Sequence, residues 1–250
     1  MKQGVELKTK SELDVMRQAG RIVGDLLRLM EVEAKPGVKT KTLDKIAEEF
    51  IRSRKAIPAF KGYYGFPASI CASVNEEVVH GIPGDRILRD GDIIGIDVGV
   101  KLDGFFSDAA RTFPIGEVDE KSKHLIRVTR EALYEGIKQA VVGNRVSDIS
   151  HAVQVHAEKY GLGVVRQYVG HGIGRNLHEE PQVPNFGKPG QGPALVEGMA
   201  LAIEPMLNLG TQDVSVLADG WTVVTKDRAR SAHFEQTIFV GRQQAEIVTE

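Results

Sequence analysis

DGDIIGID, residues 90–97, has a counterpart in EGMALAIE, residues 197–204. Both stretches open with an acidic residue and a glycine, continue through four mostly small or apolar residues, and close with Ile followed by an acid. Each is preceded by a His-Gly-Ile segment, at 80–82 and at 171–173. Because the two motifs occur in the same order twice, we infer that the chain is internally duplicated.

The segments around these motifs repeat one order of elements. Apolar residues at helical spacing predict a helix from about Ser11, its expected N-cap, to the Pro-Gly pair at 36–37, and a second helix from Thr40. After Asp119 two more helical runs follow, the second closed by Gly161 at the C′ position. Segments rich in glycine, aromatic and β-branched residues, typical of strands and loops, follow each helical pair.

Composition excludes several classes of protein. The 250 residues are 42% hydrophobic, enough for a large core, and the formal net charge of −2 gives no basic field for nucleic acid. The single cysteine permits no internal disulfide and fits a reducing compartment. The N-terminal residues contain no apolar signal region, and no stretch is apolar enough to span a membrane. We therefore expect a cytoplasmic protein with no membrane partner.

Two acidic residues interrupt apolar strands of the first half. Asp97 ends the run IIGID and Asp108 lies in FFSDAARTF. A hairpin loop at 103–104 would place the two carboxylates diagonally across the strand pair, and a loop at 102–103 would oppose them directly. Either register puts both acids on one face, where a cation is needed between them.

Two acids of the second half repeat this arrangement. Glu204 ends a strand beside small residues, and Glu235 lies in AHFEQTIFV; pairing them requires the segment 214–225 to form a hairpin of its own. Each acid alone could be a turn, cap or surface residue. Four clustered carboxylates away from water are unfavourable unless paired or metal-bound. With one imidazole they match two divalent cations and favour Mn, Fe or Co over a thiolate zinc site.

Three of the seven histidines lie in loops rich in glycine or proline beside these acids, where a scaffold can direct a side chain without packing it: His80, His171 and His178. His233 has the same strand parity as Glu235 and could be either structural or functional. The others lie on predicted helices, where a surface position is expected: His124, His151 and His156.

The chain resembles the bacterial-type (type I) methionine aminopeptidases, metallopeptidases of the pita-bread fold, in five ordered blocks: VNEEVVHGIPG, GDIIGIDVGVKLDGFFSDAARTF, GHGIGRNLHEEPQVPNFG, GMALAIEPML and SAHFEQTIFV. The resemblance implies an α+β fold with two pseudo-symmetric halves, about 11–113 and 119–250, each with two helices and antiparallel strands around a central dinuclear metal site. One catalytic domain, 1–250, is expected. The implied activity is metal-assisted hydrolysis that removes the initiator methionine from deformylated nascent chains with a small second residue.

The resemblance also assigns roles to residues. The implied ligands of two divalent ions (Co, Mn, Fe(II) or Zn) are Asp97, Asp108, His171, Glu204 and Glu235. Glu204 doubles as general base, while His80 and His178 bind the substrate and take part in catalysis. The implied methionine pocket contains Tyr63, Phe66, Cys71, Tyr168, Leu177 and Trp221. Two positions depart from the family pattern: Leu177, where many relatives carry Phe, and Phe60, where some carry Cys.

Each alternative function predicts features that differ from those expected of a methionine aminopeptidase. A proline-directed peptidase of the same fold generally carries an added N-terminal domain, for which a first helix near residue 11 leaves no room. A non-catalytic relative that binds a partner chain or RNA typically loses metal ligands, and a purely structural metal site predicts no turnover. We expect a monomer, with nascent N-termini as substrate and the ribosome as a candidate partner.

Overall fold

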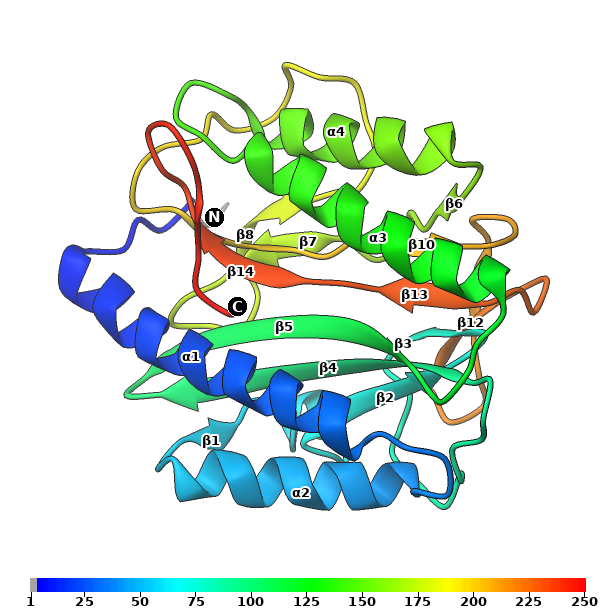
Figure 1. Ribbon diagram of the computed structural model, residues 1–250. Helices are drawn as coiled ribbons and strands as arrows, with labels where there is room; N and C mark the ends of the chain where they lie inside the picture. Colours follow the sequence, from blue (N-terminus) through cyan, green and yellow to red (C-terminus); the bar gives the residue numbers. More distant parts are fainter. Residues whose placement is uncertain (1–3) are drawn as a thin grey trace.

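The computed structural model describes residues 4–250, and within this range four α-helices lie outside antiparallel strands (Figure 1). The first half contains α1 (Lys10–Glu33), α2 (Thr40–Ser53), β1 (Ile57–Pro58), the 3-10 turn η1 (Tyr63–Gly65), β2 (Ile70–Val74), β3 (Glu77–Val79), β4 (Ile93–Leu102) and β5 (Phe105–Pro114). The second half begins with α3 (Glu120–Lys138), α4 (Val146–Lys159), β6 (Gly163–Val164), β7 (Gly170–Gly172) and β8 (Glu179–Val183). It ends with β9 (Ala200–Ile203), β10 (Met206–Asn208), β11 (Val214–Val216), β12 (Val223–Thr225), β13 (Ser231–His233), β14 (Gln236–Phe239) and β15 (Glu246–Ile247).

The helix ends follow local capping chemistry. α1 begins at Lys10 because the Thr9 side chain accepts from the backbone N–H of Glu12, whose carboxylate accepts in turn from the Thr9 backbone N–H. The expected N-cap, Ser11, is therefore wrong by two residues: Glu12 closes the capping box with Thr9, whereas Asp14, three residues after Ser11, pairs with Arg17 instead. α2 begins at Thr40 as predicted. Gly161 follows the C-cap of α4 with φ +75°, which confirms the predicted C′ glycine.

The β4–β5 hairpin positions the first two acids. Its two-residue loop is Asp103-Gly104, both with positive φ, as a type I′ turn requires. Gly99 is the direct partner of Asp108, and Ala110 is the partner of Asp97. Of the two predicted registers the diagonal one is therefore correct, and both carboxylates lie on the same face of the hairpin.

The second half places its site residues in a five-stranded sheet of order β15-β14-β9-β7-β8. His171 in β7 and Thr237 in β14 both pair with Ala202 of the central strand β9, two residues before Glu204. β11 and β12 pair antiparallel, which confirms that segment 214–225 forms its own hairpin. His171, Glu204 and the residues of β14 are thereby brought to neighbouring strands.

The two halves meet where β5 lies beside β13 and β14 (Figure 1). The backbone N–H of Glu235 donates to the Ala110 carbonyl at 2.9 Å, and the Thr112 hydroxyl donates to the His233 carbonyl at 2.9 Å. α1 packs against β4 and β5, with α2 beside it, whereas α3 and α4 cover the strands of the second half. All four helices thus support strands whose inner ends converge on one region.

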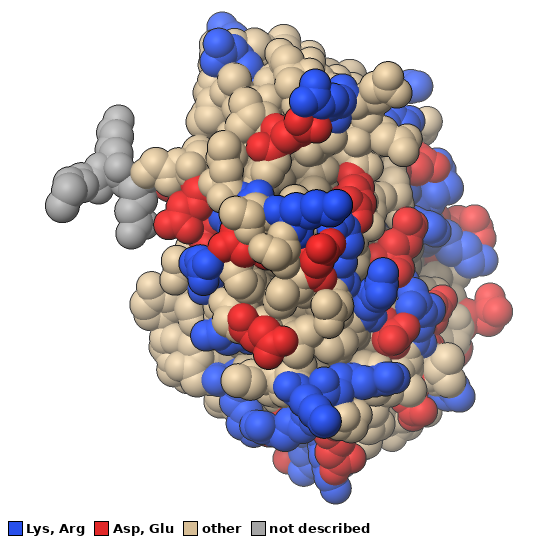
Figure 2. All heavy atoms as spheres, turned by 90° about the vertical axis from the view of Figure 1, so that its left-hand side faces the viewer, with Lys and Arg blue, Asp and Glu red and all other residues tan. Residues whose placement is uncertain are grey.

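The surface carries mixed charge. On the face drawn in Figure 2, basic and acidic side chains are interspersed, in keeping with the net charge of −2. Over the whole surface, several charged side chains form pairs along the helices, such as Arg52 with Glu48 and Arg127 with Glu131. Over residues 4–250 no helix is long and apolar enough to cross a membrane.

Candidate metal centre and active site

Three buried side chains from different strands form a cluster that could hold a metal ion. One ligand atom each from Asp108, His171 and Glu235 lies within 4.8 Å of the others. Nε2 of His171 is 3.5 Å from Oδ2 of Asp108 and 3.7 Å from Oε1 of Glu204. Asp97 lines the same cavity. All five residues expected as ligands thus converge on one place.

The tautomer of His171 shows that this cluster needs a proton or a cation between its atoms. Its Nδ1 lies 2.9 Å from the carbonyl oxygen of Gly172, so Nδ1 carries the proton and donates to that carbonyl. Nε2 then presents a lone pair to two carboxylates, which also present lone pairs. Such a group is stable only when a proton or a cation lies among these atoms. A neutral imidazole with its outer nitrogen hydrogen-bonded is the common form of a histidine metal ligand.

Glycines on both sides of His171 let β7 lie inside the sheet, between β8 and β9. A Cβ at Gly170 would lie 2.3 Å from the carbonyl oxygen of Ala202, and one at Gly172 would lie 2.3 Å from that of Glu180. Backbone contacts this close tolerate no side chain. The Gly-His-Gly sequence therefore allows β7 to fit between β8 and β9 while the imidazole points into the site.

Burial among like charges governs the acids. Burial raises the pKa of Asp97 and of Glu204 to about 8. Neighbouring carboxylates add to this rise, whereas His233 opposes it at Asp97 and His171 opposes it at Glu204. Burial also raises the pKa of Asp108, and raises that of Glu235 well above its ordinary value, where Asp108 adds to the effect. Without a cation the cluster holds protons near neutral pH, and divalent cations would replace them.

Thr237 fixes one of these acids. Its hydroxyl accepts from the backbone N–H of Asp108 at 3.1 Å and lies 3.0 Å from Oδ1 of the same residue. Oδ2 is left free to face His171. Sequence reasoning did not single out Thr237, although it shares strand parity with Glu235.

Two further histidines border the cluster. The rings of His171 and His178 lie 4.4 Å apart, and Nδ1 of His178 is 2.9 Å from the Tyr63 hydroxyl. Burial lowers the pKa of His178 and of His80 to about 4, with nearby histidines adding to the effect, so both imidazoles are neutral at pH 7. Each can donate one hydrogen bond and accept another.

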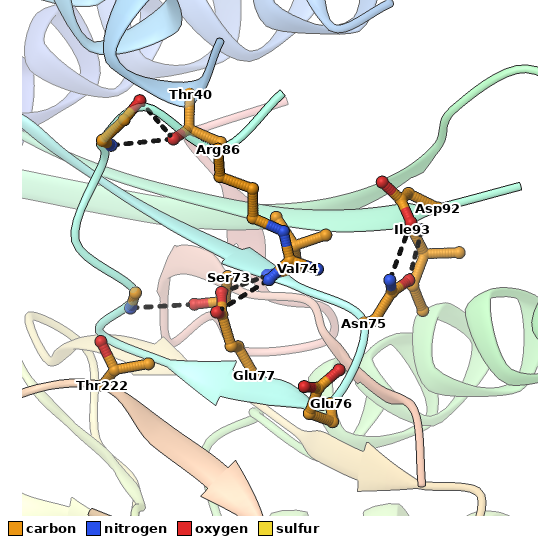
Figure 3. A network of polar contacts seen from close by, with 12 residues as sticks. Thr40, Ser73, Val74, Asn75, Glu76, Glu77, Arg86, Asp92, Ile93 and Thr222 are labelled. Atoms are coloured by element: carbon orange, nitrogen blue, oxygen red, sulfur yellow. Dashed lines mark hydrogen bonds and ion pairs between the residues drawn. The ribbon is translucent and has the colours of Figure 1, made fainter. Parts of the chain in front are cut away.

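Figure 3 shows a network of polar contacts around Ser73, Val74 and Glu77, next to the loop that carries His80 in the chain. Glu77 accepts from the Val74 backbone N–H at 2.7 Å and pairs with Arg86 at 3.0 Å. The Ser73 hydroxyl accepts from the backbone N–H of Gly81, the residue after His80. These contacts maintain His80 in a left-handed conformation, φ +59°, which non-glycine residues adopt only where the surroundings impose it.

The acids and histidines lie at one end of a cavity of about 310 Å³. Apolar and aromatic side chains form the rest of its wall, with the rings of Phe66 and Trp221 packed edge to face at 5.1 Å. Every residue expected in the substrate pocket lines this cavity, together with four further residues: Phe60, Tyr64, Val79 and Val169. One cavity therefore has both a metal-binding end and an apolar end.

The sequence matches the model of metallopeptidase family M24 over residues 14–242. It is 54% identical to a protein of Clostridium acetobutylicum named methionine aminopeptidase, over 97% of this chain and 98% of that one. The chain belongs to the M24 metallopeptidase family. The crystal structure of a methionine aminopeptidase from Thermotoga maritima superposes with a TM-score of 0.97 at 46% identity, covering 99% of this chain and all of the other.

Membership of the M24 family confirms the pita-bread fold expected from the sequence. A prolidase from Pyrococcus furiosus shares that fold with a TM-score of 0.80, at 21% identity, and this chain covers 65% of it. The two methionine aminopeptidases, by contrast, match over nearly their whole length. Among M24 relatives, the chain therefore resembles that group far more than the prolidase.

The donor set fits the divalent metal that an M24 metallopeptidase requires. Oδ1 of Asp97 is buried without a hydrogen-bond partner among the described residues, and Nε2 of His171 faces carboxylate oxygens. Oxygen ligands with one or a few imidazoles suit Mn, Fe, Co or Zn. These two unsatisfied atoms are what a cation between the strands would complete.

Proposed function

We propose that this chain removes N-terminal methionine from peptides and nascent chains with a small second residue, using two divalent metal ions. The observation that carries the proposal is the single cavity in which the Asp108–His171–Glu235 cluster meets an aromatic wall. The names of its relatives support the same activity. We assign the metal ligands to Asp97, Asp108, His171, Glu204 and Glu235, and propose one catalytic domain over 1–250 built from two halves.

The apolar end of the cavity suits a methionine side chain. Phe66, Cys71 and Trp221 pack together at one side, and Tyr168 approaches His80 with ring centres 5.6 Å apart. A thioether is flexible and makes favourable contacts with aromatic ring edges. Leu177, only 2% exposed, occupies less of the wall than the Phe of many relatives, so we expect a pocket that also accepts slightly bulkier first residues.

His178 is placed to stabilise charge on the scissile carbonyl oxygen. Burial raises the pKa of Tyr63, so its hydroxyl keeps its proton, and we assign this hydroxyl as the donor to Nδ1 of His178. The neutral imidazole must then carry its proton on Nε2, the atom available to the substrate. Donation from Nε2 would strengthen as negative charge develops on the carbonyl oxygen.

Glu204 is placed to move a proton. Bound divalent ions would supply an acidified water and polarise the carbonyl group. Glu204 lines the cavity with 14% of its side chain exposed, so it can take a proton from water and pass it to the leaving amine. His80, neutral and held in its strained conformation, is assigned to the amide nitrogen of the substrate.

The assignment also sets the cellular role. The substrate must present a free α-amine, so we propose that the enzyme acts after deformylation, in the cytoplasm, as a monomer that meets chains near the ribosome. Co, Mn, Fe(II) and Zn remain the candidate ions.

The decisive experiment is release of free methionine from Met-Ala-Ser by metal-free protein titrated with Mn²⁺, Fe²⁺, Co²⁺ or Zn²⁺. Met-Leu-Ser and N-formyl-Met-Ala-Ser are the matched controls. We expect metal-dependent release from Met-Ala-Ser, much slower release from Met-Leu-Ser, and none from the formylated peptide. Release that needs no metal, or cleavage inside the peptide, would disprove the proposal.

A further inference from the structure

His233 is a buried histidine beside the metal cluster that lies outside the five assigned ligands. Only 3% of it is exposed, and its Nε2 has no hydrogen-bond partner among residues 4–250. This nitrogen lies 3.6 Å from Oε2 of Glu204. A buried polar atom left unpaired is costly, so the position needs an explanation.

Both halves of the molecule fix the backbone of His233. Its N–H donates to the Thr112 hydroxyl at 2.9 Å, and that hydroxyl lies 2.9 Å from the His233 carbonyl. Thr112 belongs to β5 of the first half, whereas Met206 of β10 is the direct strand partner of His233 in the second. The imidazole therefore approaches Glu204 from a rigid support.

The two oxygens of Glu204 face different imidazoles. Oε1 lies 3.7 Å from Nε2 of His171, and Oε2 lies 3.6 Å from Nε2 of His233. The proton of His171 is on Nδ1, where it bonds the Gly172 carbonyl, so its Nε2 can approach ionised Glu204 only through a cation or a shared proton. Among residues 4–250 no hydrogen bond fixes the proton of His233, so its Nε2 can carry that proton and donate. One oxygen of Glu204 thus faces the ion site and the other faces an imidazole nitrogen that is able to donate.

We propose that His233 is a positioning residue that donates from Nε2 to Oε2 of Glu204 and keeps Oε1 directed at the metal site. The inference rests on the proposed function for the role of Glu204. Outer hydrogen-bond partners of this kind orient metal ligands, and losing one typically costs on the order of 10–100-fold in metal affinity or activity. The contact joins β13 to the end of β9. Because the backbone of His233 in β13 also bonds Thr112 of β5, ion binding would be linked to the place where the two halves meet.

The test measures Mn²⁺ binding to metal-free protein by calorimetry, without peptide. We expect His233→Leu to raise the dissociation constant by on the order of 10–100-fold with the number of ions unchanged. His233→Gln, which retains an N–H donor, should stay within a few-fold of the wild type. His156→Leu, on α4 away from the cavity, is the matched histidine control and should leave binding unaltered.

A double-mutant cycle separates positioning from direct ligation. If His233 acts through Glu204, then His233→Leu should weaken binding little further in a Glu204→Gln protein. Loss of one bound ion in His233→Leu, or failure of His233→Gln to restore affinity, would make His233 a ligand and overturn the inference. Unchanged affinity in His233→Leu would overturn it as well. Should His233→Leu fail to fold, His233→Met supplies a donor-free side chain of similar length for the same comparison.

These outcomes are distinct from failure of the proposed function. Binding constants report on His233 whether or not methionine is released, whereas the peptide assay on the wild type reports on the activity alone. In the active enzyme we expect His233→Leu to lower kcat more than it raises KM, because Glu204 contacts the ions and the proton rather than the methionine side chain.

Discussion

The Tyr63 hydroxyl lies 2.9 Å from Nδ1 of His178, on the side of the ring that leaves Nε2 for a substrate. Tyr63→Phe removes the donor while keeping the ring, and His178 can then shift its proton to Nδ1. We expect kcat to fall roughly tenfold, the loss of about one hydrogen bond, with KM and bound metal little changed. Steady-state kinetics with metal analysis checks this, and Tyr134→Phe, remote from the cavity, is the control. A rise in KM alone would instead make Tyr63 only a wall of the pocket.

Glu204 should be needed for turnover more than for folding. Glu204→Gln keeps the volume of the side chain but removes its capacity to take up a proton, so we expect kcat to fall by roughly 10²–10⁴-fold. Circular dichroism should show an intact fold, since the site lies at the edge of a cavity and not in the core. Near-normal kcat in a protein with bound metal would exclude the proposed role.

His178 should matter to catalysis more than to metal binding. His178→Ala removes the donor proposed for the carbonyl oxygen, and we expect kcat to fall by roughly 10²–10³-fold with metal content unaltered. Elemental analysis of the purified variant provides the check. If one equivalent of metal disappears with the side chain, His178 is a ligand and its assigned role is wrong.

Gly172 should be intolerant of any side chain. A Cβ would lie 2.3 Å from the carbonyl oxygen of Glu180, so Gly172→Ala must separate β7 from β8 and displace His171. We expect a loss of roughly 1–3 kcal/mol in the free energy of unfolding, with weaker metal binding. Gly84→Ala is the matched control, since its nearest atom is 3.9 Å away and its φ is ordinary. Equal stability in the two variants, measured by urea unfolding, would contradict this account of β7.

The metal-free protein should lose stability as pH rises. Asp97 and Glu204 have ordinary pKa values near 4 when unfolded and about 8 when folded, so the folded state binds their protons more tightly; the stability this gives is complete below about pH 4 and is lost as pH rises to about 8. His80 and His178, with folded pKa values of about 4, contribute no slope above pH 7. We expect the Tm of metal-free protein to fall between about pH 7 and 8 and to level off above that range, and the metal-loaded protein to change less. A flat or rising Tm without metal would show that these carboxylates are already ionised.

Much of the fold could be read from local patterns. Helix starts and the Asp103-Gly104 turn follow from short-range chemistry, although Thr9 rather than Ser11 caps the first helix because Glu12 bonds back to Thr9 while Asp14 pairs with Arg17. The duplicated motifs indicated two equivalent sets of elements, and each half does carry two helices followed by antiparallel strands.

The site was predictable only in part. The alternation of side chains along a strand indicates which residues share a face. The sequence alone therefore predicts that Asp97 and Asp108 lie on the same face of their hairpin. The hydrogen bonds across the seam, Thr112 with His233 and Thr237 with Asp108, join residues more than a hundred positions apart. No local pattern specifies such contacts. For this reason the sequence leaves the role of His233 open, whereas the structure of residues 4–250 shows its Nε2 buried without a hydrogen-bond partner.

The most direct test of the central claim is anomalous diffraction from crystals of the protein loaded with Mn²⁺ or Co²⁺. The account predicts two peaks roughly 3.5–4 Å apart, enclosed by Asp97, Asp108, His171, Glu204 and Glu235. Peaks elsewhere on the protein, or an active enzyme with no ion among these five side chains, would contradict it.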